Sequence, residues 1–237
     1  MSGLKIAALY GLKPHQLGLC GSREAARNQT LQKFLKKQAS TQEAKQALEQ
    51  FRGAYPYYKL IAKANRIKNP FTEKVVKAYW VGNELLDKVK TKDLRNMVAR
   101  NFAGAGLLDK KTAQRKADKI PEGAKPHHSF HVLFIGSVTG SVNFNSTKIK
   151  DICRVGIGRI KSHKNGKIVV ATRLLTGKKK IKLGKLVERE IFWDKDILPK
   201  LKIGDWISFH WNQAVEILTA KEAANLEQYT KFTLSLL

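Results

Sequence analysis

The chain has 237 residues, of which 43% are hydrophobic and 27% are charged. This composition lies near the average of globular proteins and excludes a chain that stays disordered. The length allows one large domain or two small ones. Only two cysteines occur, Cys20 and Cys153, so a fold built on disulfides is excluded as well.

The sequence shows no signal peptide and no membrane span. The first twelve residues lack a basic cluster, a long apolar stretch and a cleavage site of small residues. No apolar run approaches the roughly 20 residues needed to cross a bilayer. We therefore expect a soluble cytoplasmic protein with no membrane partner, in which both cysteines stay reduced.

Residues 22–108 predict helices that pack on one another, because apolar residues recur there at every third and fourth position. Ser40 and Glu43 have the spacing of a capping box, which predicts the start of one helix. Further helical patterns cover 71–89, 92–102 and 110–120. We expect a helical domain over residues 1–120, with a dense aromatic group in its core: Tyr55, Tyr57, Tyr58, Tyr79 and Trp80.

The segment 121–126 contains two prolines and a glycine, so it cannot extend a helix and predicts a linker. A short apolar run follows at 131–135. We interpret residues 121–150 as a linker with an edge strand.

The remainder of the chain, residues 151–237, predicts a small β-barrel and a terminal helix. Asn165-Gly166 is a hairpin signal, and Thr219 followed by Glu222 opens a helix that runs to about Leu236. The predicted strands are 153–160, 167–175, 181–186, 188–193 and 206–211. The predicted fold class is α+β, an all-helical N-terminal domain followed by a small OB-like β-barrel with a C-terminal helix.

Two motifs frame this C-terminal part. The first opens on Cys153 and continues through Gly158 and Arg159 to Ile160, and the second runs from Gly204 through Asp205 to His210, followed by Ala214–Thr219. Over these roughly 85 residues the chain resembles the hydrogenase assembly chaperones of the HypC/HupF type, which are small barrels with a C-terminal helix. As a whole it resembles an uncharacterised prokaryotic family.

The resemblance implies a non-enzymatic accessory role in building the iron centre of a [NiFe] hydrogenase or a related metalloenzyme. Cys153 then contacts the precursor of the hydrogenase large subunit or an iron-donor maturation protein, and His210 is the second matching residue. No tightly bound cofactor is implied, and iron is a transient ligand at most. Thiolate and imidazole both suit iron or zinc. The alternative for Cys153 is a small side chain buried in a strand, and for His210 a strand histidine bonded to the backbone.

A second group of residues predicts a metal site at the junction of the two parts. Cys20 comes directly before a predicted helix, where the backbone N–H groups favour a reactive thiolate. In an extended segment, His127 and His131 point to one side and His128 to the other. With Cys153 these residues form a mixed sulfur and nitrogen site, or serve a thiol- or metal-dependent enzyme. Alternatively, the histidines bond to loop carbonyls.

The charge balance supports a third hypothesis. Lys and Arg number 45 against 19 Asp and Glu, a formal net charge of +26. Such a charge is typical of proteins that bind a polyanion. We therefore keep a basic nucleic-acid-binding protein, whose barrel follows a phosphate backbone, as the alternative to the maturation factor.

Overall fold

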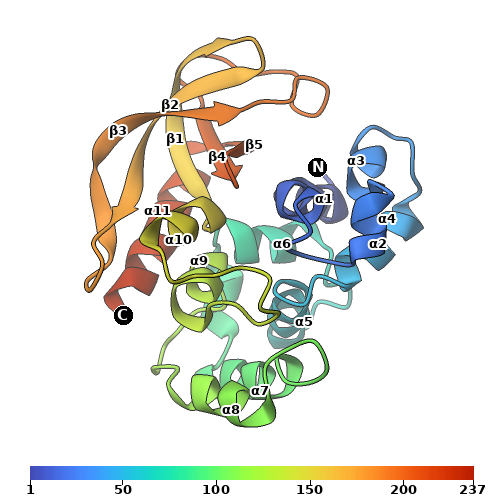
Figure 1. Ribbon diagram of the computed structural model, residues 1–237, viewed down its shortest axis with the longest axis vertical. Helices are drawn as coiled ribbons and strands as arrows, with labels where there is room; N and C mark the ends of the chain where they lie inside the picture. Colours follow the sequence, from blue (N-terminus) through green and yellow to red (C-terminus); the bar gives the residue numbers. More distant parts are fainter.

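The computed structural model describes all residues from 1 to 237 and has a helical N-terminal part, a closed five-stranded β-barrel and a C-terminal helix (Figure 1). The predicted α+β class is confirmed. The helices before the barrel are α1 (Gly3–Gln16), α2 (Arg23–Arg27), α3 (Thr30–Leu35), α4 (Thr41–Glu49), α5 (Tyr55–Ala64), α6 (Glu73–Trp80), η1 (Glu84–Lys88), α7 (Thr91–Asn101), α8 (Lys110–Asp118), α9 (His128–Phe130), η2 (His131–Ile135) and α10 (Thr147–Cys153).

Helix α1 has no amphipathic pattern to predict it, because its buried residues surround the helix axis. Ile6, Ala7, Ala8 and Tyr10 have no exposed surface, as expected of a helix that lies inside a core. The helix packs against α3, α4 and α6 and also touches strands β4 and β5. It therefore joins the two ends of the chain.

The predicted start of α4 is confirmed by a complete capping box. The Ser40 hydroxyl accepts the N–H of Glu43 at 3.1 Å, and the Glu43 carboxylate accepts the N–H of Ser40 at 2.8 Å. Each contact satisfies a backbone donor that the first helical turn leaves free. The predicted aromatic core is also present, since Tyr57, Tyr58 and Tyr79 are buried.

The predicted edge strand between residues 121 and 150 is wrong. The apolar run at 131–135 forms the single π-helical turn η2, directly after α9. A short apolar run suits a buried strand and a buried helical turn equally well, so its hydrophobicity did not decide between them. Because this segment is helical and not extended, the side chains of His127, His128 and His131 point in other directions than predicted.

The barrel consists of β1 (Gly156–Lys164), β2 (Lys167–Thr176), β3 (Lys182–Phe192), β4 (Trp206–His210) and β5 (Gln213–Leu218). It closes in the order β1-β2-β3-β5-β4, with β1 also paired to β4. All pairs are antiparallel except β3 with β5. The two strands predicted over 181–193 are one long strand, β3, and the fifth strand is β5.

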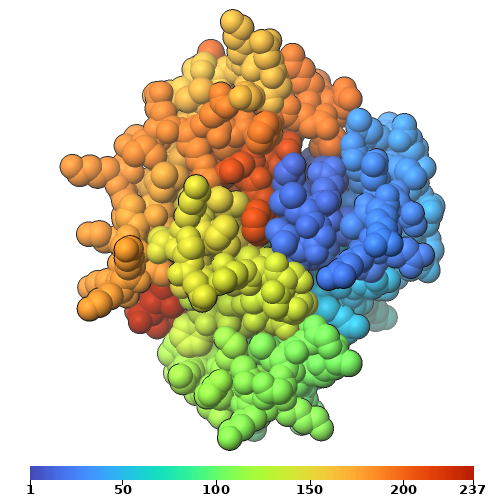
Figure 2. Space-filling model, in the orientation of Figure 1, coloured from blue at the N-terminus to red at the C-terminus, as the bar shows by residue number.

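The terminal helix α11 (Ala220–Ser235) begins with the predicted capping box of Thr219 and Glu222. The largest hydrophobic core, of 44 residues, extends from Leu4 through the helices to Val155, Val215 and Leu226, and a separate cluster of eight residues fills the barrel. Figure 2 shows the N-terminal helices, in blue, directly against the yellow middle segment and the red strands. The helical part and the barrel thus share a core. No helix has the length and apolar character that a bilayer span requires.

Candidate metal centre

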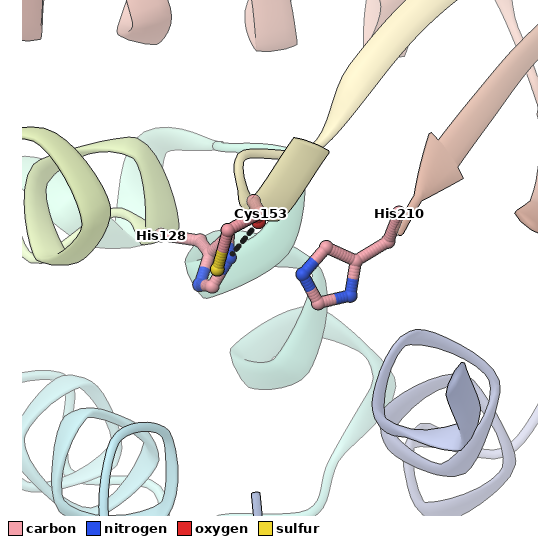
Figure 3. Close-up of side chains that lie close together, drawn as sticks. All are labelled: His128, Cys153 and His210. Carbon is pink, nitrogen blue, oxygen red and sulfur yellow. Dashed lines mark hydrogen bonds between the residues drawn. The ribbon is translucent and has the colours of Figure 1, made fainter. Parts of the chain in front are cut away.

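Three predicted site residues come together where the helical part meets the barrel. His128 starts α9, Cys153 ends α10 and His210 ends β4. Each offers one ligand atom, and these atoms lie within 4.8 Å of one another. All three side chains are buried, and Figure 3 shows them converging from three separate segments. The predicted strand position of Cys153 is wrong, because β1 begins only at Gly156.

His210 presents a free ring nitrogen to this centre. Its Nδ1 lies 2.7 Å from the carbonyl oxygen of Tyr10. Since a carbonyl only accepts, Nδ1 carries the hydrogen and Nε2 keeps its lone pair. Nε2 is buried without a hydrogen-bond partner, and in Figure 3 this side of the ring faces Cys153 and His128. Burial lowers the pKa of His210 to about 4, so the ring is neutral near pH 7.

His128 takes part in three linked hydrogen-bond contacts. Its ring and the Tyr79 hydroxyl together have too few hydrogens to make all three. The Tyr79 hydroxyl donates to the Gly53 carbonyl at 2.8 Å. His128 Nδ1 is 3.0 Å from that hydroxyl, and Nε2 is 2.9 Å from the Cys153 carbonyl. Burial, helped by His210 and His131, holds the pKa of His128 well below its usual value, so the ring has one hydrogen.

A neutral His128 and Tyr79 supply two hydrogens for these three contacts. If Nδ1 donates to Tyr79, the Nε2 lone pair faces the lone pairs of the Cys153 carbonyl. In the other tautomer Nε2–H donates to the Cys153 carbonyl, and Tyr79 donates to Nδ1 instead of to Gly53. A cation bound by Nε2 selects the first tautomer and removes the repulsion. A metal-binding histidine commonly has this arrangement, with its second ring nitrogen bonded to an outer partner.

The backbone at Cys153 is fixed by a buried ion network on both sides of it. The Asp151 carboxylate accepts from Arg154 at 2.8 Å, from Arg189 at 2.9 Å and from the N–H of Leu175 at 2.8 Å. Burial raises the pKa of the Cys153 thiol well above its usual value. The free thiol is therefore protonated at neutral pH, and a bound metal ion would replace its proton.

Cys20 does not have the low pKa that its sequence position predicts. The following helix, α2, has only five residues and is capped by Ser22. The thiol packs against the hydrophobic core, and burial raises its pKa to about 12. The prediction of a reactive thiolate at Cys20 is wrong, because removal from water outweighs the field of so short a helix.

The other two predicted histidines have their own partners. His131 Nδ1 contacts the Tyr57 hydroxyl at 3.2 Å, and burial lowers its pKa to about 4. His127 accepts the N–H of Ser129 at 3.1 Å and stacks on Tyr229. Neither residue belongs to the group of three, and the expected pairing of His127 with His131 on one side is wrong because the segment is helical.

A cavity of about 510 Å³ adjoins the three residues. Cys20 and His131 also line it, so five of the six predicted site residues share one cavity and only His127 does not. None of the lining residues is an Asp or a Glu. Apart from the Tyr79 hydroxyl, the ligand types that its titratable side chains offer are imidazole nitrogen and thiol sulfur, which favour zinc, copper, nickel or iron over magnesium or calcium.

Sequence patterns identify the ligands but not the residues that orient them. Tyr10 acts through its backbone oxygen, a group that every residue possesses. Tyr79 belongs to an aromatic group that predicts core packing, and its hydroxyl gives no separate signal. Only the position of these residues in space identifies their role.

The model of one protein family, described as "Family of unknown function (DUF6390)", matches residues 1–237. No curated protein and no solved structure matches the chain.

Proposed function

This chain belongs to the family of unknown function DUF6390 over its whole length, and we propose that it is a metal-handling accessory protein. His128, Cys153 and His210 bind a transition metal ion where the barrel meets the helices. The ion is transient cargo for a metalloenzyme under assembly, and iron for a [NiFe] hydrogenase is the case that the motifs at Cys153 and His210 favour. The protein acts as a maturation factor without an enzymatic reaction of its own.

The observation that supports this proposal is the free Nε2 of His210, buried within 4.8 Å of the ligand atoms of His128 and Cys153. A buried polar atom without a partner is costly. Nε2 of His15 and Nε2 of His127 are also buried without a partner, but only that of His210 lies in a group of three ligand residues. A metal ion would satisfy it and would also relieve the contact at His128. With three protein ligands, a tetrahedral ion keeps one position for a group from the cavity or from a partner.

The first test is metal binding by the purified protein. We expect one Co²⁺ or Zn²⁺ per chain and, with Co²⁺, thiolate-to-metal charge-transfer absorption. Cys153→Ser and His210→Gln each remove a direct ligand. We expect each to weaken metal binding by more than about 100-fold, because the loss of an outer-shell partner alone weakens it by up to about 100-fold.

Cys20→Ser and His163→Gln are matched controls, because Cys20 lies outside the group of three and His163 is exposed on β1. Both should bind metal as the wild type does, and circular dichroism should show that all four variants are folded. Equal metal binding by Cys153→Ser and the wild type would disprove the proposed site.

The second test concerns the partner. Immobilised wild-type protein is expected to retain a hydrogenase large-subunit precursor or an iron-donor maturation protein, and Cys153→Ala is expected to lose it, because the thiol is the proposed contact. Cys20→Ser again serves as the control. Unchanged retention by Cys153→Ala would reject the maturation role while leaving metal binding to be judged by the first test.

A further inference from the structure

A second concave site lies on the outside of the barrel, beside helix α11. A groove of about 400 Å³ runs between strands β1, β2 and β3 and helix α11. Its floor includes small side chains of α11, Ala220, Ala223 and Ala224. In Figure 1 the β2-β3 hairpin extends beside α11 towards the C-terminus, and the two elements are in contact. The metal centre has no residue in this groove.

The groove carries positive charge that nothing in the protein neutralises. Arg159, Lys161 and Arg173 line it, all three are exposed, and none forms an ion pair. Arg173 donates to the Gly184 carbonyl at 3.0 Å, which leaves its charge uncompensated. The only carboxylate in the lining, Glu227, is paired with Lys231 at 2.8 Å.

The surrounding strands strengthen this charge. From 156 to 192 the chain has 11 Lys and Arg and only two acidic residues, both Glu. One of these, Glu190, is paired with Lys167 at 2.7 Å. Residues 156–192 thus carry a net +9 of the protein's +26, more than their share of the chain length, and such a surface attracts polyanions over long range.

An aromatic side chain lies among these cations. The Arg159 guanidinium is 4.7 Å from the centre of the Trp206 ring, and Trp206 is partly exposed in the groove. Leu186 adds an exposed apolar surface, 61% accessible. Flat apolar surface beside unpaired cations is the combination with which proteins bind single-stranded nucleic acids, since bases stack while phosphates pair with Lys and Arg. An acidic peptide could pair with the cations, but its carboxylate side chains would not stack on the apolar surface.

We propose that this groove binds single-stranded nucleic acid. Arg159, Lys161 and Arg173 contact the phosphates, and a base packs against Trp206. The volume suits one or two nucleotides, and the β2-β3 hairpin carries the flanking phosphates. The inference is independent of the metal centre, and either one stands if the other fails.

The test measures fluorescence anisotropy of labelled 12-nucleotide oligouridine and oligothymidine at several salt concentrations. The full-length wild-type protein is expected to bind at least one of them, with affinity that falls steeply as salt rises. The triple variant Arg159→Ala, Lys161→Ala, Arg173→Ala is expected to bind more than tenfold more weakly. Its salt slope should be smaller by about 2, since each phosphate contact to a single strand contributes about 0.7.

The charge-matched control replaces Lys110, Lys111 and Lys119 with Ala. These exposed lysines lie on or next to α8, at the far end of the molecule from the barrel in Figure 1. We expect the control to bind within twofold of the wild type. Equal weakening in both triple variants, no binding by the wild type, or equal competition by a 12-residue polyglutamate peptide would each overturn the proposal. Comparing the two oligonucleotides shows whether RNA or DNA is preferred.

Discussion

Acidification from pH 7 to pH 5 is expected to unfold the protein. Burial is the largest cause that lowers the pKa of four histidines, to about 3 for His127, to about 4 for His131 and His210, and well below its usual value for His128. The unfolded chain binds protons at these residues near pH 6.5 and the folded protein does not. Stability is therefore complete above pH 6.5 and is lost as pH falls towards 4.

Each of these histidines contributes a slope that rises from about 0.7 kcal/mol per pH unit at pH 6.5 to about 1.4 well below it. Four of them together remove roughly 6–7 kcal/mol between pH 6.5 and pH 5, which is comparable to the total stability of roughly 5–15 kcal/mol of a typical domain. Glu216 has the opposite effect on the pH dependence of stability, because burial raises its pKa. It is a single group, whereas the histidines are four.

Urea unfolding followed by circular dichroism at pH 7.5, 6.5 and 5.5 would measure the slope. In His127→Asn the amide can still accept the N–H of Ser129, and the slope averaged from pH 7.5 to 5.5 is expected to fall by about 0.7 kcal/mol per pH unit. His163→Asn, an exposed histidine, should leave it unchanged. A free energy of unfolding that does not vary over this range would contradict the neutral, buried state of the four rings.

Removing the charge of Asp151 is expected to cost about 3–5 kcal/mol. The carboxylate is buried and accepts hydrogen bonds from Arg154, Arg189 and the N–H of Leu175. Arg154 is only 2% exposed. In Asp151→Asn its guanidinium would stay buried with no opposite charge in contact, and this uncompensated charge is the main source of the cost.

The matched control is Glu190→Gln, which removes a carboxylate from an exposed pair with Lys167. Exposed pairs contribute little, so the expected loss is below about 1 kcal/mol. Chemical unfolding at pH 7.5 compares the two variants. If both lost the same small free energy, Asp151 would not be the anchor between α10 and the barrel that its contacts indicate.

The amphipathic helices and their caps were predictable because each depends on residues close in sequence. Ser40 with Glu43 and Thr219 with Glu222 form their capping boxes as expected. The segments that failed depend on tertiary context. The apolar pattern at 131–135 fits a strand and a helical turn equally well. In the sequence, β5 resembles a segment that leads into the terminal helix, because its pairing with β4 and β3 depends on tertiary contacts.

The metal centre was predictable in its residue types but not in its grouping. Cys153 was expected beside His210 in one site and beside His128 in another, and the structure places these three together. Cys20 was expected to be activated by a helix, yet burial controls its pKa. Burial and hydrogen-bond direction arise from the packing of distant segments, and no local spacing encodes them.

The dependence of His210 on Tyr10 has a consequence for biosynthesis. The bond that sets its tautomer joins residues 200 positions apart, so a ribosome must release almost the whole polypeptide before this contact can form. A nascent chain that already exposes His128 and Cys153 lacks the third ligand and the carbonyl that orients it. Under the proposed function, loading of the site with an ion is therefore a late, post-translational event, and prematurely terminated chains would be unable to sequester metal there.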